Sequence, residues 1–359
     1  MGKRIAFMGA GAVGSYVGGH LTRVGEDVTL IDPWPEHVET IKREGLRLEG
    51  TQGEHLVRPK ALHLHEAQGL FKTPIDVAFV CTKSYDTVWA ATLISQYLAP
   101  NGFVVSLQNG INEERIAGVV GWGRVVGVIA SSISVNAYAP GHVTRTVQPG
   151  GPGYTVFRVG EVHGRVTARI EEIAAWLTAV DSAKTTTNLW GERWSKLVTN
   201  TSGNGVSALT GMASNKITVD PELRRLRIQL AGEAVAVGQA LGYEIEPIMG
   251  MPAQAQRAAA EGDRAAYDQI EAKMLDGLKR MTDDGRPSTG QDIVKGRRTE
   301  IDFLNGLVAD KGDEVGLPAP THRAVVQVVH EVERGEHAPS RALADRVWDL
   351  AGVRPKVFA

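Results

Sequence analysis

The chain has 359 residues, of which 43% are hydrophobic and 22% charged, and its formal net charge at pH 7 is −2. This length favours two domains, because one hydrophobic core rarely organises so many residues. The near-neutral charge gives neither a basic surface for nucleic acid nor a cationic face for membranes. We therefore expect no nucleic-acid or membrane partner, and a small molecule as the ligand.

The cysteine count and the apolar runs bear on the compartment. Cys81 is the single cysteine, which excludes an internal disulfide framework and fits a reducing environment. No apolar run approaches membrane-spanning length, and the first residues are typical of a strand rather than a signal peptide. We expect a cytoplasmic protein. No grouping of His, Cys and Asp has the spacing of a metal site, so we expect no metal.

The N-terminal segment predicts a dinucleotide site. An apolar strand over 4–8 leads directly into Gly9-Ala-Gly-Ala-Val-Gly14, and a helical pattern and a second strand follow. In this setting Gly9 permits a tight turn, Gly11 lets backbone amides approach a pyrophosphate, and Gly14 allows close packing of the helix, whose N-terminus attracts phosphate. The residues that we expect at the cofactor here are Gly9, Ala10, Gly11, Ala12, Val13 and Gly14.

Strands and helices alternate through the first half of the chain. Apolar strands are expected at 75–81, 103–107 and 125–129, with helical segments between them, a pattern typical of a doubly wound parallel sheet. Between Gly141 and Gly160 the residues become rich in Gly, Pro and alternating Val, Thr, Tyr and Phe. This segment predicts a strand pair that extends the sheet.

The second half of the chain has almost entirely helical periodicity from Leu189 onward. We therefore predict an α/β protein with an N-terminal Rossmann-like domain over 1–184 and an all-α substrate and dimerisation domain over 185–359. The Ala-rich stretch 253–281 predicts exposed or lid-like helices. The apolar stripes are numerous for one small bundle, which favours a homodimer.

A polar stripe marks the first long helix of the second half. Lys196, Asn200 and Asn204 are spaced four apart, which places one ammonium and two amides on a single helix face. Apolar residues interleave with them, so the stripe borders packed surface, where an unpaired polar group costs roughly 2–7 kcal/mol. A bound substrate would satisfy these groups. The alternative is an ordinary solvated helix face.

Two further polar clusters carry the chemistry. Lys83 and Asn109 follow successive strands, and ligands bind at the carboxyl ends of parallel strands. Pro287-Ser288 predicts a helix start, and the helical pattern continues to Glu300, with Gly296 four residues earlier leaving space above that carboxylate.

These motifs resemble the ketopantoate reductase (2-dehydropantoate 2-reductase) family over nearly the whole chain. The resemblance implies a general acid at Lys196, a supporting carboxylate at Glu300, and a substrate held by amides and a hydroxyl. It implies that Lys83, Asn109 and Glu300 also meet the cofactor. The substrate-binding positions that it implies are Asn109, Asn200, Asn204 and Ser288.

The expected reaction is the reduction of a 2-oxo acid by a nicotinamide. Negative charge develops on the carbonyl oxygen, and an ammonium at Lys196 would stabilise that charge and deliver the proton. Partial desolvation would lower the pKa of Lys196, and a nearby Glu300 carboxylate would raise it.

The second strand bears on the cofactor. Asp32 ends that strand 18 residues after Gly14, where a carboxylate accepts hydrogen bonds from ribose hydroxyls and repels a 2′-phosphate. No Arg or Lys follows until Lys42, and His37 would be mostly neutral at pH 7. We expect NAD in preference to NADP. The alternative is that Asp32 only starts a turn before Pro33.

Four other functions stay open at this point. A D-2-hydroxy-acid dehydrogenase of the same family would act on another branched or aromatic substrate. A β-hydroxyacid dehydrogenase shares the domain plan but is not expected to carry the segment around Glu300. A methyltransferase would have no use for Lys196 and Glu300. A non-catalytic dinucleotide sensor would bind NAD(H) without turnover.

Overall fold

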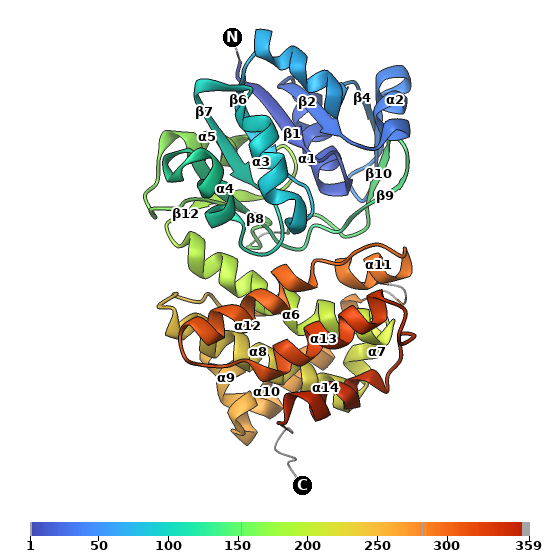
Figure 1. Cartoon of the computed structure of the whole chain (residues 1–359), viewed down its shortest axis with the longest axis vertical. Helices are drawn as coiled ribbons and strands as arrows, with labels where there is room; N and C mark the ends of the chain where they lie inside the picture. The colour runs from blue at the N-terminus through green and yellow to red at the C-terminus, as the bar shows by residue number, and fades with distance from the viewer. Residues whose placement is uncertain (1, 152, 282, 284, 354–359) are drawn as a thin grey trace. The chain divides into compact units, whose positions relative to one another are not determined.

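The computed structural model describes residues 2–151, 153–281, 283 and 285–353. Two compact units make up the chain, Met1–Leu189 (blue to green in Figure 1) and Trp190–Ala359 (yellow-green to red). The boundary that we expect after residue 184 stays a prediction.

The first unit is built on an eight-stranded sheet in the order β12-β11-β8-β7-β6-β1-β2-β5. Six strands that are neighbours in the order β8-β7-β6-β1-β2-β5 pair in parallel. Strand β11 is antiparallel to β8, and β12 is parallel to β11. The chain therefore winds outward from β1 to β5 and then outward again from β6 to β8, which confirms the predicted doubly wound sheet. The strands are β1 (Arg4–Met8), β2 (Asp27–Asp32), β5 (Lys60–His63), β6 (Ile75–Val80), β7 (Leu98–Ser106), β8 (Val125–Ala130), β11 (Phe157–Glu161) and β12 (Ala183–Thr186).

Helices cover both faces of this sheet, as the alternation along β1 requires. Ile5 and Phe7 belong to one buried cluster, which includes apolar residues of α1 and α5, whereas Ala6 and Met8 belong to another, with α3 and α4 (Figure 1). Both faces being buried explains why the strands are continuous apolar runs. The helices are α1 (Ala12–Arg23), α2 (Pro35–Glu44), α3 (Thr87–Ser95), α4 (Glu113–Val120) and α5 (Ala168–Leu177), with the 3-10 helices η1 (Leu64–Lys72), η2 (Ser84–Asp86) and η3 (Trp122–Arg124).

A second, four-stranded sheet packs beside α1 in the order β4-β3-β10-β9. Its strands are β3 (Leu46–Gly50), β4 (His55–Val57), β9 (Val135–Ala139) and β10 (His142–Arg145). The prediction of a strand pair extending the main sheet between Gly141 and Gly160 is therefore wrong for β10, which pairs with β3. It holds only for β11. The alternation in sequence marks both strands but cannot tell which partner each one finds.

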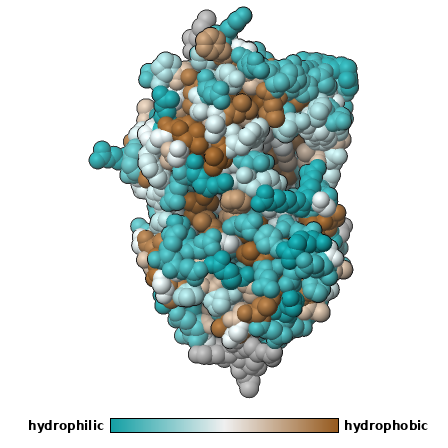
Figure 2. Space-filling model, viewed as in Figure 1, coloured by the Kyte–Doolittle hydropathy of each residue, from teal (hydrophilic) through white to brown (hydrophobic). Residues whose placement is uncertain are grey.

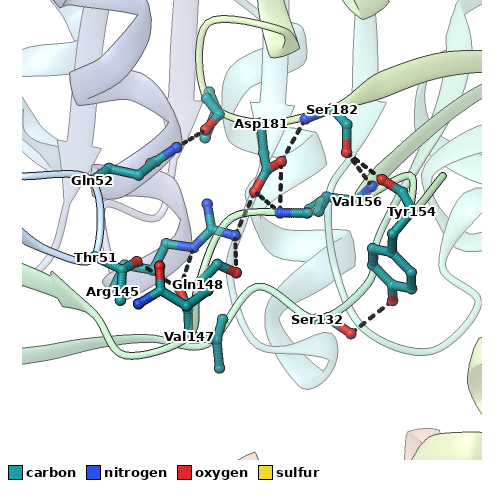
Figure 3. Close-up of polar contacts among 12 residues, drawn as sticks. Thr51, Gln52, Ser132, Arg145, Val147, Gln148, Tyr154, Val156, Asp181 and Ser182 are labelled. Carbon is teal, nitrogen blue, oxygen red and sulfur yellow. Dashed lines mark hydrogen bonds and ion pairs between the residues drawn. The ribbon is translucent and has the colours of Figure 1, made fainter. Parts of the chain in front are cut away.

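A buried ion pair holds β10 against the segment that leads to β12 (Figure 3). The Arg145 guanidinium contacts the Asp181 carboxylate, and both side chains are almost fully buried. Asp181 also accepts hydrogen bonds from the backbone N–H groups of Gly150 (3.1 Å) and Ser182 (2.6 Å). Removing either partner would leave an uncompensated buried charge, at a cost of about 3–5 kcal/mol.

In the described residues of the second unit, all regular secondary structure is helical apart from an isolated bridge between Ile248 and Met251. This confirms the predicted pairing of a Rossmann-like unit with an all-α unit. Its helices are α6 (Leu189–Thr210), α7 (Ser214–Val219), α8 (Pro221–Ala240), α9 (Ala253–Glu261), α10 (Arg264–Asp276), α11 (Ser288–Val294), α12 (Asn305–Glu314), α13 (Pro320–Glu333) and α14 (Leu343–Ala351), with the 3-10 helices η4 (Gly277–Arg280) and η5 (Ile301–Phe303).

The Ala-rich helices α9 and α10 are not simply exposed. Ile270 and Met274 of α10 are buried in a cluster with Ile228 of α8 and Ala259 of α9. At Gly232 of α8, an added Cβ would lie 2.1 Å from the Cβ of Ala260, so the two helices approach closely because the residues at their contact are small. The expectation that residues 253–281 form exposed or lid-like helices is therefore wrong for the faces of α9 and α10 that pack in this cluster.

None of the described helices is long and apolar enough to cross a membrane. Figure 2 shows hydrophilic residues over most of the visible face, with hydrophobic residues in separate patches between them.

Candidate active site

The glycine motif forms a tight turn at the point where the sheet order reverses, between β1 and β6. Gly9 has a φ of +93°, and a Cβ there would lie 2.9 Å from the Thr82 nitrogen. A Cβ at Gly14 would lie 2.1 Å from the Gly9 oxygen. At Gly11, which precedes α1, a Cβ would meet no atom within 4 Å. The turn thus leaves no space for a side chain at Gly9 and Gly14, but it leaves space at Gly11 beside the helix N-terminus, where a phosphate would bind.

Asp32 ends β2 beside this turn and is 8% exposed. Burial raises the pKa of its carboxyl, and hydrogen bonds from the backbone of Trp34 and Ala10 lower it. The Trp34 N–H donates to Asp32 Oδ1 at 2.9 Å, which is the turn that the sequence offered as an alternative.

The sequence singled out His37 and Lys42 as the cation candidates after β2, and the structure brings the His37 imidazole within electrostatic reach of the Asp32 carboxylate. His37 is fully buried, and burial lowers the pKa of its imidazole. Its Nδ1 accepts from the Gly141 N–H at 2.9 Å, so in the neutral ring Nε2 carries the proton and donates to Ser15 Oγ at 3.1 Å. Lys42 pairs with Glu66 at 2.8 Å and with Glu39 at 3.2 Å.

Lys83 and Asn109 lie where predicted, just after β6 and β7. Because these strands and β1 and β2 are neighbours in a parallel sheet, their carboxyl ends bring Lys83 and Asn109 to the same edge as the glycine turn and Asp32.

A polar cluster that the sequence analysis missed supports the Asn109 loop. Asn112 Nδ2 donates to the Asn109 carbonyl at 2.8 Å, and Ser84 Oγ donates to the same oxygen at 3.3 Å. Gln108 donates to Thr87 Oγ1 at 2.9 Å. Ser84, Thr87 and Asn112 are nearly fully buried, so this network fixes the backbone on which Asn109 stands. The signal was available as polar residues directly after two apolar strands.

Lys196 lies on α6 in the second unit and has a strongly perturbed pKa. The pKa of its ammonium is lowered to about 7, chiefly because burial disfavours the charge and also because the Arg193 guanidinium repels it, while the Glu300 carboxylate acts in the opposite direction. The structure thus brings Lys196 and Glu300 close enough to interact, as the sequence predicted. Arg193, which is 1% exposed, was missed. Its position three residues before Lys196 was the signal, since residues three apart share a helix face.

The two asparagines of the polar stripe differ in their contacts. Asn204 Nδ2 donates to Ser288 Oγ at 3.4 Å, and Gly290 lets α11 approach α6, because a Cβ there would lie 2.3 Å from Ser207 Oγ. Asn200 Nδ2 is buried and has no hydrogen-bond partner among the residues that the structure describes. A buried amide without a partner is costly, so this atom is suited to a ligand oxygen.

The local structure around Glu300 differs from the prediction. Helix α11 does begin at Ser288, but it ends at Val294, and Gly296 has a φ of +62°. Glu300 directly precedes η5 and is 4% exposed. The expected helical relation between Gly296 and Glu300 is therefore wrong, because glycine in the left-handed conformation ends the helix.

These features define a dinucleotide-binding α/β protein with a helical unit that carries a half-buried lysine, a buried carboxylate and amides. The family model described as ketopantoate reductase PanE/ApbA matches residues 5–159, and the model of its C-terminal domain matches residues 188–333. The 2-dehydropantoate 2-reductase of Archaeoglobus fulgidus is 30% identical over 334 residues, which cover 93% of this chain and 99% of that protein.

Two solved structures are similar over most of the chain. A PanE/ApbA family ketopantoate reductase from Ralstonia eutropha JMP134 is 28% identical, with a TM-score of 0.74 over 93% of this chain and 100% of that one. A D-mandelate dehydrogenase, solved with NADH and anilino(oxo)acetate, shares the fold, with 21% identity and a TM-score of 0.77 over 92% of this chain and 98% of that one. The chain belongs to the ketopantoate reductase family, and it is an oxidoreductase that acts on a CH–OH group.

Proposed function

We propose that this protein reduces 2-dehydropantoate to D-pantoate with a nicotinamide dinucleotide, and that Lys196 is the general acid. The single observation that carries this proposal is the pKa of Lys196, which burial lowers to about 7. A general acid works best when its pKa lies near the operating pH. An ordinary surface lysine would hold its proton too tightly to release it.

The residues around Lys196 suit the charge that develops during reduction. The nicotinamide, when bound, supplies the hydride. The Lys196 ammonium then stabilises the negative charge on the substrate oxygen and donates a proton to it. Glu300 keeps more of Lys196 protonated, since it raises the pKa of the ammonium. Asn200 Nδ2 is a buried donor suited to a second substrate oxygen, and Asn204 and Ser288 extend the same polar surface.

In the first unit, we assign cofactor binding to the glycine turn, with Lys83 and Asn109 at the same sheet edge. NADH is the preferred cofactor in this proposal, because Asp32 would accept hydrogen bonds from ribose hydroxyls. A 2′-phosphate at this position would instead meet a carboxylate. Neither of the two nearby cation candidates compensates, because His37 is neutral and Lys42 is engaged by two glutamates.

The alternative within the same chemistry is an NAD-dependent D-2-hydroxy-acid dehydrogenase for another branched or aromatic acid. The same acid and amides would serve it in either direction. A non-catalytic dinucleotide sensor is the alternative from another class. The near-neutral pKa of Lys196 argues against the sensor, because binding alone does not require a titrating lysine.

The decisive experiment measures steady-state kinetics of the full chain with 2-dehydropantoate and a panel of branched and aromatic 2-oxo acids, each with NADH and NADPH. Lys196→Ala should lower kcat by about 10²–10⁴-fold while the affinity for the dinucleotide stays near normal. Lys216→Ala, at an exposed lysine of α7, is the matched control. Near wild-type turnover by the Lys196 variant would remove this residue from the mechanism, and no turnover with any acid would favour the sensor.

We further propose that the protein acts as a cytoplasmic homodimer. The support is the number of apolar helix faces in the second unit, and sedimentation tests the dimer directly. A single species at the monomer mass of 38.6 kDa at micromolar concentration would contradict it.

A further inference from the structure

The segment that carries Glu300 is tied to α13 on both sides of that residue. On one side, the Thr299 backbone N–H donates to Glu333 Oε1 at 2.7 Å. On the other side, Asp302 Oδ1 lies 2.7 Å from His330 Nε2. The two residues of α13 also bond to each other, because His330 Nδ1 lies 2.7 Å from Glu333 Oε2. We call Thr299, Asp302, His330 and Glu333 the α13 clamp.

The α13 clamp requires a charged histidine. A carboxylate only accepts hydrogen bonds, so the His330 ring must carry a proton on both nitrogens to donate to Asp302 and Glu333 together. Burial opposes this charge, but the hydrogen bonds to Glu333 and Asp302 and the charges of both carboxylates outweigh it and raise the pKa of His330. Both hydrogen bonds are therefore charge-assisted, and such bonds are about twice as strong as neutral ones.

Thr299 extends the clamp across the backbone of Glu300. Thr299 is 2% exposed, and its Oγ1 accepts from the Ile301 N–H at 3.3 Å. Burial raises the pKa of Glu333, but the hydroxyl and backbone N–H of Thr299 and the ring of His330 donate to it and hold that pKa below its usual range. The Thr299 hydroxyl thus links the peptide that follows Glu300 to α13.

We propose that His330 and Glu333 are positioning residues. They hold the segment of Glu300 on α13 and thereby keep its carboxylate beside Lys196. In the part of the chain that the structure describes, the charges that act on the Lys196 ammonium come from Arg193 and Glu300. The attraction between a carboxylate and a cation falls with their separation, so release of the clamp would weaken it. This inference rests on the proposed pairing of Glu300 with Lys196 and names the residues that maintain it.

The sign of the effect distinguishes positioning from a direct charge effect. A direct effect of losing the His330 imidazolium would remove a positive charge and so raise the pKa of Lys196. Displacement of the Glu300 carboxylate would lower that pKa, because the carboxylate raises it. His330→Ala should therefore lower the pKa of Lys196 if the histidine acts through Glu300.

The test measures the pKa of Lys196 in the full chain without substrate. Acetic anhydride acetylates the neutral amine, so the extent of acetylation at Lys196 against pH, read by peptide mass spectrometry, reports this pKa. We expect His330→Ala and Glu333→Ala to lower it by about 0.4 pH unit or more, the lower end of the coupling within one hydrogen-bond network. His337→Ala should leave it unchanged and is the matched control, since His337 is an exposed histidine beside Glu331.

A double-mutant cycle with Glu300→Gln decides whether the histidine acts through this carboxylate. In the Glu300→Gln background, His330→Ala should cause no further shift. Asp302→Ala, at a side chain that is 38% exposed, breaks the same contact and serves if His330→Ala fails to fold.

Three results would overturn the proposal. The first is a pKa of Lys196 that the clamp variants leave where the control leaves it, as expected if the apolar packing of Ile301 alone fixed the segment. The second is a rise in this pKa, and the third is a shift that adds to that of Glu300→Gln. The readout needs no turnover, so failure of this proposal is separate from failure of the proposed reaction, which the kinetic panel reports.

Discussion

Replacing Lys196 with methionine should stabilise the protein while lowering its kcat by about 10²–10⁴-fold. The pKa of about 7 in the folded chain, in place of 10.5, corresponds to about 5 kcal/mol at 1.36 kcal/mol per pH unit. This is the order of magnitude of the cost of holding the ammonium charged in its buried position. Methionine has a similar length and carries no charge, so the variant removes that cost.

The sign of the effect depends on pH in a defined way. Folding opposes protonation of Lys196, so its cost is fully present below about pH 7, decreases as the pH rises toward 10.5, and disappears above it. The stability gained by Lys196→Met should therefore fall by about 1.4 kcal/mol for each pH unit between 7.5 and 10. Urea unfolding at several pH values measures this gain.

The control for this prediction is Lys216→Met, which replaces an exposed lysine of α7 and should change stability little at any pH. Two results would refute the reasoning. One is a Lys196 variant that is no more stable than the wild type at pH 7.5, and the other is a gain in stability that does not vary with pH.

Three further predictions concern the two halves of the proposed mechanism. Glu300→Gln should lower the pKa of Lys196, because the carboxylate raises it. The reduction rate of this variant should therefore begin to decline at a lower pH than that of the wild type. If the two pH–rate curves coincide, Glu300 has only a structural role. Asp32→Ala should shift the ratio of kcat/KM for NADH over NADPH by about tenfold or more toward NADPH, and an unchanged ratio would contradict its role. Gly11→Ala should change the free energy of unfolding by no more than about 0.5 kcal/mol relative to the wild type, yet weaken NADH binding. Gly14→Ala should destabilise the fold, because its Cβ would meet the Gly9 oxygen. Equal stability of the two variants would argue against the turn described.

The fold was largely predictable because its information is local. Apolar runs with glycine turns mark the parallel strands, and the helical period marks the second unit. Partner choice was not predictable, since β10 carries the same alternation whether it joins the main sheet or β3. In the fold, β10 pairs with β3 and β9 and carries Arg145, whose ion-pair partner Asp181 is 36 residues away in sequence. Long-range pairs of this kind leave no trace in a local pattern.

The polar groups of the candidate site divide in the same way. The four-residue spacing predicted that Lys196, Asn200 and Asn204 lie on one helix face, and all three lie in the continuous helix α6. Spacing could not place Glu300, because Gly296 ends the preceding helix and the approach of Glu300 to Lys196 is a tertiary contact. Arg193 was overlooked because an arginine in a helix is normally solvated, and only packing shows that this one is buried.

The two interpretations of Asp32 that the sequence offered are compatible with each other. A carboxylate has about four lone-pair sites, and the backbone of Trp34 and Ala10 uses two of them. The turn therefore fixes the carboxylate without exhausting it, and two acceptor sites remain for the hydroxyls of a ribose. Replacing those hydroxyls with a 2′-phosphate would bring a second negative charge to a group whose pKa burial already raises. The turn thus holds the acceptor in place, and the proposed preference for NADH rests on the same carboxylate.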